Sequence, residues 1–192
     1  VPAEGKALTS NYYKNEAEAF SGLVATYDIM KKNSGGFENM IAMLNAGSDD
    51  HFAGGGGDSD GRGIQSFSNY SQDAYTIPQS FWNDHFQGVF RANILLQKVP
   101  STTMDANVKK RFVAEAKALR ALYYFNLVRM FKNVPLFTQP VVPAEIYNVT
   151  QAKPEEVYAQ IEKDLTEAIT DLPATISATE NGRVTKGAAK AL

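Results

Sequence analysis

The side chains best suited to binding a ligand are concentrated in one glycine-rich stretch, residues 47–75. It combines carboxylates, an imidazole, a guanidinium and aromatic rings, which are groups that bind polar ligands. The stretch shows no helical period, and structureless stretches of this length in compact domains are usually functional or disordered. We therefore predict an irregular loop that binds a polar ligand. The candidate ligand-binding residues are His51, Phe52, Asp58, Asp60, Arg62, Tyr70 and Tyr75.

The glycine run at 54–57 does not have the sequence of a phosphate-binding loop. A Walker loop ends in Gly-Lys-Ser or Gly-Lys-Thr at the start of a helix, so that the lysine reaches the phosphates. Asp58 follows the run here, and the nearby charges are mostly acidic. The sequence thus disfavours nucleotide binding.

Residues 58–63 weakly resemble a calcium-binding EF-hand loop. Such a loop needs oxygen ligands at positions 1, 3 and 5 and a bidentate glutamate at position 12. Position 5 is Arg62 and position 12 is Asn69, so a true EF-hand is excluded. A solvated turn is the favoured interpretation, a looser calcium site remains open, and no other cofactor is expected.

The sequence contains no arrangement typical of an enzyme active site. There are no cysteines and no Gly-x-Ser-x-Gly elbow, and the two histidines lack metal-ligand spacing. His85 lies in a helical apolar pattern and is expected to be a packed core residue, whereas His51 is more open to a ligand role. A catalytic carboxylate pair must face across a cleft, and Asp49-Asp50 is more typical of a turn. No catalysis is predicted.

Length and composition indicate a folded globular domain. The chain has 192 residues, of which 44% are hydrophobic and 21% charged, so one domain with a sizeable core is expected. The formal net charge of -2 argues against a nucleic-acid surface. No apolar run reaches the roughly 18 residues of a membrane-spanning helix, and no signal peptide is visible.

The elements that position these groups are predicted to be helices packed around one central segment, residues 111–139. Its apolar residues follow steps of three and four, and its second half is apolar nearly all round, which is typical of a buried helix. Asp105 is expected to cap this helix, and Asn133 to end it in a left-handed conformation. Buried charges must be paired, so structural pairing rather than catalysis is expected for three of its charged residues. These are Glu115, Arg120 and Arg129.

Further helices are predicted from the same periodicity at about 15–32, 37–45, 78–99 and 154–171. Asn15 and Glu18 have the spacing of a capping box at the first of them, and Thr185 is expected to cap a last helix. The aromatic stripe Phe81, Trp82, Phe86 and Phe90 is interpreted as core. Pro135, Pro140 and Pro143 should keep the connection after the central helix extended.

The last predicted helix is short. It has under two turns and reaches Leu192 without a C-cap, and isolated helices shorter than about 12 residues are marginal. We therefore expect residues 1–192 to be the N-terminal part of a single domain that continues beyond this helix.

The central segment resembles the signature of the SusD/RagB family, outer-membrane nutrient-binding lipoproteins of Bacteroidetes. The matching elements are Ala114-Glu115-Ala116, Leu119-Arg120-Ala121, Tyr123-Tyr124-Phe125, Leu127-Val128-Arg129 and Val134-Pro135-Leu136. Three flanking pieces agree in order, at 91–99, 155–173 and 182–192. The resemblance covers roughly residue 15 to the end. It departs from the family at Lys132-Asn133, where Gly-Asp or Gly-Asn is usual, and in lacking the lipidated N-terminal cysteine.

The resemblance implies an all-α, tetratricopeptide-like helical scaffold with long irregular loops. It also implies a cell-surface lipoprotein of the outer membrane that binds a glycan or another nutrient without catalysis. Its implied partner is a SusC-type TonB-dependent transporter, over which it acts as a lid. In the family, loops away from the transporter-facing helices bind the ligand, and the segment after the short second helix contributes.

Two other functions remain open from the residues alone. A tetratricopeptide-type adaptor would bind protein partners through a helical groove, but it would not need a long loop rich in glycine, aspartate and aromatic residues. A glycan-cleaving enzyme would show turnover of oligosaccharides rather than binding alone.

Overall fold

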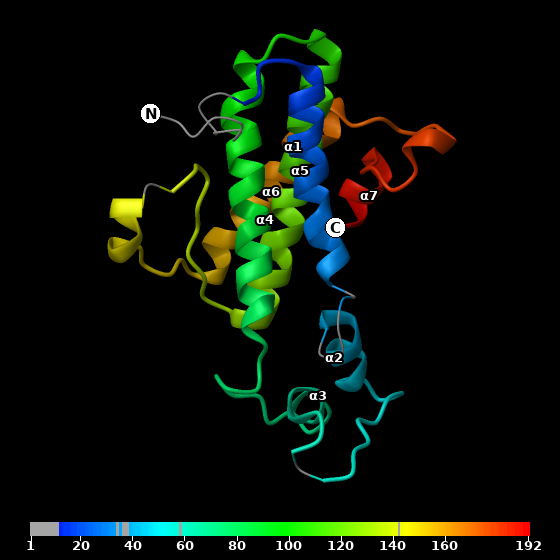
Figure 1. Ribbon diagram of the computed structural model, residues 1–192, viewed down its shortest axis with the longest axis vertical. Helices are drawn as coiled ribbons and strands as arrows, with labels where there is room; N and C mark the ends of the chain where they lie inside the picture. Colours follow the sequence, from blue (N-terminus) through cyan, green and yellow to red (C-terminus); the bar gives the residue numbers. More distant parts are fainter. Residues whose placement is uncertain (1–11, 34, 36–38, 58, 142) are drawn as a thin grey trace, which may run out of the picture. The chain divides into compact units, whose positions relative to one another are not determined.

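The computed structural model describes residues 12–33, 35, 39–57, 59–141 and 143–192 (Figure 1). These residues form helices, and within them the only β-structure consists of isolated bridges. The α-helices are α1 (Glu16–Lys32), α2 (Met40–Ala46), α3 (Arg62–Ser68), α4 (Gln79–Lys98), α5 (Ala106–Phe131), α6 (Pro154–Asp171) and α7 (Lys186–Ala191). Short 3-10 helices are η1 (Val99–Ser101), η2 (Pro143–Asn148) and η3 (Ala178–Glu180). The predicted all-α class is confirmed.

The described chain divides into two compact units. Asp28–His85 form one unit, called here the α2–α3 unit, and the remaining residues form the other, called here the α5 unit. The boundaries fall inside α1 and α4, so each of these helices contributes to both units. The expectation of a single continuing domain stays a prediction.

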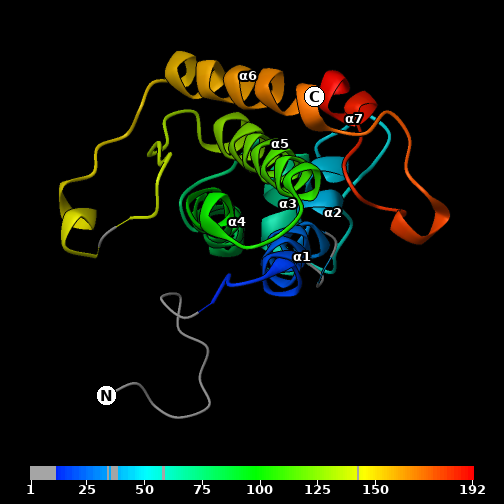
Figure 2. The same cartoon turned by 90° about the horizontal axis from the view of Figure 1, so that it is seen from above.

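Helix α5 is the centre of its unit, as predicted. Figure 2 shows α6 on one side of α5 and both α1 and α4 on the other. Leu119, Tyr123, Tyr124 and Leu127 are fully buried on α5 because neighbouring helices cover it from both sides.

The predicted helix starts are confirmed by their capping bonds. The Asp105 carboxylate accepts hydrogen bonds from the backbone amides of Asn107 (2.8 Å) and Val108 (3.1 Å). At the start of α1, the Asn15 side chain accepts from the Glu18 amide at 3.0 Å. These bonds satisfy amides that have no partner inside the helix.

Two expectations after the central helix are wrong. The residue with positive φ is Lys132, at 62°, rather than Asn133, and its amide donates to the Val128 carbonyl. Pro143 begins a 3-10 helix instead of extended chain. The fixed φ of proline suits the first residue of a helical turn as well as an extended strand, so the proline spacing alone could not distinguish them.

Buried ion pairs fix the arrangement of the α5 unit. The Arg120 guanidinium forms two hydrogen bonds with the Asp164 carboxylate, at 2.6 and 2.8 Å, which join α5 to α6. It also donates to Asn93 on α4 and to the Thr138 carbonyl. Such a charge is tolerated in a core only when it is paired and hydrogen-bonded, which confirms the predicted structural role of Arg120.

The Glu115 carboxylate is the second buried charge on α5 and is fully buried. It accepts hydrogen bonds from Arg111, Arg183 and the Tyr27 hydroxyl, at 2.6–3.1 Å. The cluster therefore ties α5 to α1 and to the connection between α6 and α7. Arg129, the third residue for which a structural pair is predicted, donates to the uncharged Asn126 side chain at 2.8 Å.

The aromatic stripe on α4 is only partly core. Phe81 is 5% exposed, but Phe90 is 46% exposed. Phe86 packs edge-to-face against Tyr124 at 6.4 Å between ring centroids. The stripe is wider than the face that α4 can bury, so its outermost ring meets solvent.

Candidate functional site

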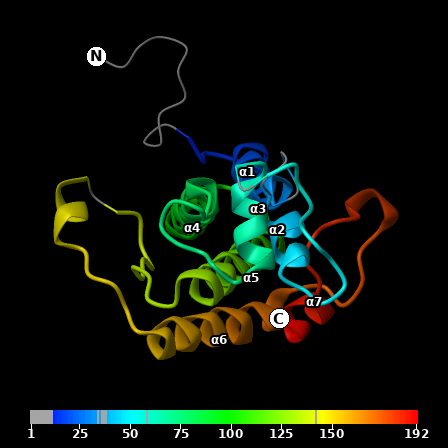
Figure 3. The same ribbon diagram turned by 90° about the horizontal axis from the view of Figure 1, so that it is seen from below.

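The predicted ligand-binding stretch is not wholly irregular, because it contains α3. The expectation that residues 47–75 lack a helix is therefore wrong. Helices α2 and α3 pack against each other in the α2–α3 unit (Figure 3). Met43 of α2 and Ser66 of α3 are buried. Seven residues give too short a pattern for a helical period to stand out among so many glycines.

Both ends of α3 depend on residues with positive φ. Gly61 precedes the helix in the left-handed conformation, with φ at 66°. Tyr70 follows it with φ at 53°, although side chains other than glycine adopt such values rarely. The Tyr70 hydroxyl donates a 2.6 Å hydrogen bond to the Gly47 carbonyl, at the end of α2. This bond closes the loop of residues 47–70 at its base.

A polar pocket of about 200 Å³ lies along one face of α3. Its lining side chains carry a guanidinium, two carboxamides and three hydroxyls. The Arg62, Asn69 and Ser71 side chains can donate to a ligand that carries many hydroxyl groups, and the carboxamide and hydroxyl oxygens can accept from it. The donors of Gln65, Ser66 and Thr76 are already bonded to backbone carbonyls. The lining residues are Arg62, Gln65, Ser66, Asn69, Ser71 and Thr76.

A tight turn beside the pocket presents Tyr75. The Asp73 carboxylate accepts from the amides of Tyr75 (2.8 Å) and Thr76 (2.9 Å). These backbone hydrogen bonds, with the Thr76 hydroxyl and the nearby Arg62 guanidinium, lower the pKa of Asp73 below its ordinary value. The turn leaves the Tyr75 ring 92% exposed next to lining residue Thr76.

The glycine run is shaped by two side chains of the same unit. The Asp60 carboxylate accepts from the Gly56 amide at 2.9 Å. The Gln65 amide donates to the carbonyls of Asp60 (2.6 Å) and Gly57 (3.1 Å). A Cβ on Gly55 would lie 2.6 Å from the Gln65 nitrogen, and φ there is 156°, so glycine is required.

The structure distributes the predicted residues unevenly. Arg62 lines the pocket, and Tyr70 and Tyr75 are exposed neighbours of lining residues. His51 and Phe52 are exposed in the loop before α3 and do not line the pocket. Asp60 hydrogen-bonds within the loop. The remaining candidate, Asp58, lies outside the described residues.

Sequence reasoning missed most of the lining residues. It did not single out Gln65, Ser66, Ser71 or Thr76. A signal was nevertheless present, because Arg62, Gln65, Ser66 and Asn69 follow steps of three, one and three. That spacing places them on one face if the segment is a helix, and the sequence alone did not predict a helix there.

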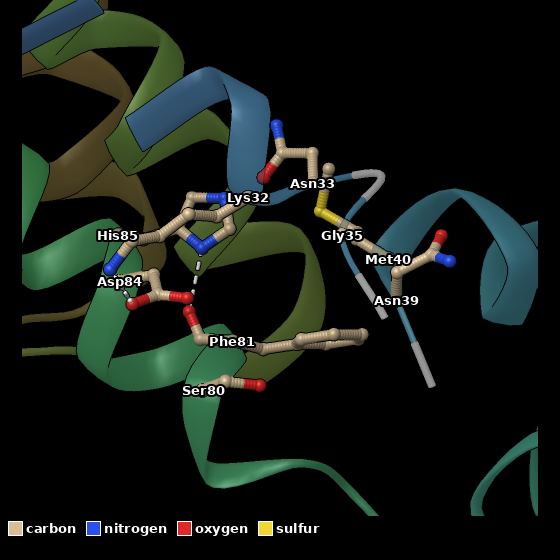
Figure 4. A pocket seen from close by; sticks show the side chains of 9 residues that line it. All are labelled: Lys32, Asn33, Gly35, Asn39, Met40, Ser80, Phe81, Asp84 and His85. Atoms are coloured by element: carbon tan, nitrogen blue, oxygen red, sulfur yellow. Dashed lines mark hydrogen bonds and ion pairs between the residues drawn. The ribbon is translucent and has the colours of Figure 1, made fainter. Parts of the chain in front are cut away.

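A second pocket of about 250 Å³ lies in the same unit, beside His85 (Figure 4). The Lys32 ammonium and the Asp84 carboxylate form an ion pair at 2.7 Å on its wall. His85 is 1% exposed and its Nδ1 lies 2.6 Å from the Phe81 carbonyl. Burial lowers the pKa of His85 below its ordinary value, although the Phe81 carbonyl and Asp84 oppose the shift. The prediction of a packed, hydrogen-bonded histidine is confirmed.

Neither a metal-binding cluster nor a membrane-spanning helix is present among the described residues. No group of three or more His, Cys, Asp or Glu side chains gathers in the part of the chain that the structure describes. Within that part, no helix has both the length and the apolarity required to cross a bilayer.

Comparisons with known proteins agree on one family. Residues 56–192 match the SusD-like family described as starch-binding and associating with the outer membrane. SusD-like protein P25 of Formosa agariphila is 24% identical over 192 residues, which cover 93% of this chain and 35% of that protein.

Solved structures show the same relationship. A laminarin-binding SusD-like protein superposes with a TM-score of 0.88 and 60% identity, over 93% of this chain and 39% of that one. Surface glycan-binding protein A from Bacteroides fluxus gives a TM-score of 0.80 and 26% identity, over 91% of this chain and 38% of that one. The chain thus spans between a third and two fifths of the length of these relatives. With its tetratricopeptide-like helical fold and a family match over more than half of its residues, the chain belongs to the SusD-like family.

Proposed function

We propose that this chain binds a neutral glycan at the cell surface and that the α3 pocket, with Tyr75 beside it, is the binding site. The observation that carries the proposal is the pocket itself, because its lining offers donors and acceptors to a polyhydroxylated ligand. The exposed Tyr75 ring can stack on the apolar face of a sugar. Sugar sites combine such a ring with a few fixed polar groups.

The ligand class is supported by similarity. The SusD-like structure that is 60% identical over 93% of this chain is named for laminarin, an uncharged glucose polymer. The α3 pocket matches a neutral ligand, because Arg62 already faces the Asp73 carboxylate at 3.9 Å. Laminarin or a similar glucan is therefore the proposed ligand, and binding alone, without cleavage, is the proposed activity.

We further propose that the whole protein is a lipoprotein of the outer membrane that delivers its ligand to a SusC-type TonB-dependent transporter. The family description supports an association with the outer membrane. Retention of the protein on a detergent-solubilised SusC-type transporter would test the partnership. A protein that passes such a column as freely as an unrelated helical protein would contradict it.

Calorimetric titration with laminarin tests the binding site. Arg62→Ala and Tyr75→Ala should each weaken binding about tenfold, equivalent to roughly 1.4 kcal/mol, because one removes polar contacts and the other the stacking surface. Phe52→Ala tests whether the site extends into the preceding loop, since Phe52 is 85% exposed. Tyr147→Ala is the matched control, because Tyr147 is 91% exposed and belongs to the α5 unit.

Two results would contradict the proposal. Wild-type affinity in both Arg62→Ala and Tyr75→Ala would remove the α3 pocket as the site. Equal weakening by Tyr147→Ala would show that the loss is not local. We also expect no cofactor requirement, so the affinity for laminarin should be the same with and without a chelator. A weaker affinity in the presence of a chelator would indicate a loose calcium site involving Asp60 or Asp58.

A further inference from the structure

A cleft of about 350 Å³ lies in the α5 unit, whereas the α3 pocket belongs to the α2–α3 unit. It lies between the first turns of α1, the first turns of α5 and the connection between α6 and α7. Its volume falls within the usual range of small-ligand sites, roughly 300–1,000 Å³. The residues that could contact a ligand are Glu16, Phe20, Arg111, Phe112, Glu180 and Arg183.

The cleft contains a buried donor without a partner. Arg111 Nε donates to Glu115 at 2.9 Å, and Nη1 pairs with Glu180 at 2.9 Å. Arg111 Nη2 is buried and has no hydrogen-bond partner. A buried donor left in this state costs about 1–3 kcal/mol, and because the Arg111 side chain as a whole is 23% exposed, a small shift of this side chain would bring Nη2 to an acceptor in the cleft.

An aromatic wall stands beside this donor. The Phe20 and Phe112 rings lie 5.9 Å apart between centroids, tilted by 37°. Phe112 is almost fully buried, but Phe20 remains 43% exposed. The Arg183 guanidinium lies 5.7 Å from each ring centroid and holds the pair in place. The exposed part of Phe20 is therefore an apolar surface with a fixed position.

The charges around the cleft favour an uncharged ligand. Two guanidiniums, of Arg111 and Arg183, face three carboxylates, of Glu16, Glu115 and Glu180. The local balance is thus one negative charge, which disfavours an anion. The Glu16 and Glu180 carboxylates can accept hydrogen bonds from hydroxyl groups.

We propose that this cleft is a second sugar subsite, which holds one hexose unit of a neutral glycan. Hydroxyls donate to Glu16 or Glu180, and the apolar ring face lies on Phe20. A further hydroxyl oxygen accepts from Arg111 Nη2 once the Arg111 side chain has shifted toward the cleft. The inference rests on the proposed glycan binding for its ligand class, but its residues belong to the other unit. A glycan-binding protein with two subsites binds a polymer more tightly than either subsite alone, provided that one chain can reach both.

The test uses laminaritriose and the Tyr75→Ala variant, in which the α3 pocket is weakened. Titration should shift the side-chain Nε–H resonances of Arg111 and Arg183 in the NMR spectrum, because the sugar contacts these guanidiniums. Adding Phe20→Ala should weaken that binding at least tenfold by removing the apolar surface. Glu16→Gln should weaken it less and is a milder change in case Phe20→Ala fails to fold.

Val24→Ala is the matched control, because Val24 is 49% exposed on the same helix and does not line the cleft. The second subsite is overturned if the arginine resonances do not shift at saturating laminaritriose. It is also overturned if the affinity derived from these shifts is the same in Phe20→Ala as without that change. Shifts produced by a partner protein and not by the sugar overturn it as well. None of these results bears on the proposal that the α3 pocket binds the glycan. That proposal is contradicted separately, if Arg62→Ala and Tyr75→Ala bind laminarin with wild-type affinity.

Discussion

Individual residues of this protein show how a buried polar group is kept in a defined state. Tyr27 donates to the Glu115 carboxylate and accepts from the Val184 amide at 2.9 Å. Burial, together with the neighbouring Glu115 charge and hydrogen bond, raises the pKa of Tyr27 far above its ordinary value. The hydroxyl therefore remains a donor at all physiological pH values, and the cluster has one stable hydrogen-bonding pattern.

His85 is expected to make stability depend on pH. It is buried with a lowered pKa, so the folded protein resists protonating it, while the unfolded chain takes up a proton at the ordinary value of about 6.5. Below that value the unfolded state binds more protons, and the free energy of unfolding falls as the pH falls. His85→Gln should flatten this dependence between about pH 6.5 and pH 5 in urea unfolding.

His51→Gln provides the control for that series. His51 is exposed in the loop before α3, so its replacement should leave the slope of stability against pH in place. A slope that persists unchanged in His85→Gln would show that another group is responsible. Carboxylates with lowered pKa values, such as those of Asp73 and Glu167, contribute a separate loss at lower pH.

At the scale of elements, the close contact between α4 and α5 depends on the absence of a side chain at Gly88. A Cβ there would lie 2.5–2.9 Å from ring atoms of Tyr123. The ring cannot easily move, because Tyr123 is fully buried and its hydroxyl donates to the Thr26 carbonyl. Gly88→Ala should therefore lower the free energy of unfolding by about 1–3 kcal/mol, as measured by urea denaturation.

Gly187→Ala is the matched control for this packing effect. A Cβ on Gly187 has its nearest atom at 3.8 Å, the Thr185 hydroxyl oxygen. Alanine favours helix over glycine by roughly 1 kcal/mol, so this variant should be neutral or slightly stabilised. Wild-type stability in Gly88→Ala would contradict the close approach of α4 and α5.

Helix α3 marks the limit of element prediction from this sequence. The long helices are predicted by apolar periodicity over four or more turns, and their first residues are predicted by capping residues such as Asn15 and Asp105. In α3 the periodic residues are polar, and Gly61 and Gly63 stand at its start. Its helical state depends on packing against α2 and on the Tyr70 hydroxyl bond, and neither is a property of its own seven residues.

For the whole molecule, we expect stability to be concentrated around α5. Helices lie on both sides of α5, and its central side chains are fully buried (Figure 2). Local opening costs least where few apolar contacts must break, and residues 51–57 are largely exposed. Hydrogen–deuterium exchange should therefore be slowest in α5 and fastest in 51–57. Comparable rates in a peptide from 119–127 and one from 51–57 would disprove this distribution.

The two candidate sugar sites lie in different units of the molecule. The α3 pocket belongs to the α2–α3 unit and the Phe20 cleft to the α5 unit. The chain spans only about two fifths of its solved relatives, so partner binding and delivery belong to proposals about a longer protein. This chain contributes a helical scaffold, and its two pockets are the sugar sites that we propose.

The sequence by itself determined the central helix, the all-α class and the family. These follow from patterns repeated over many neighbouring residues, such as the signature around Leu119, Arg120 and Ala121, so they need no knowledge of distant contacts. It also indicated the stretch that carries the candidate site. Only the tertiary structure decided which residues of that stretch meet.

Two examples show why the tertiary structure was needed. Thr76 joins Arg62 in one pocket because the Asp73 turn brings the chain back beside α3. Arg111 is left with an unpartnered nitrogen because Glu180, 69 positions later in the chain, occupies Nη1 and Glu115 occupies Nε. The first outcome depends on where a local turn places the chain, and the second on a pair 69 positions apart. Both are set by how the whole chain packs.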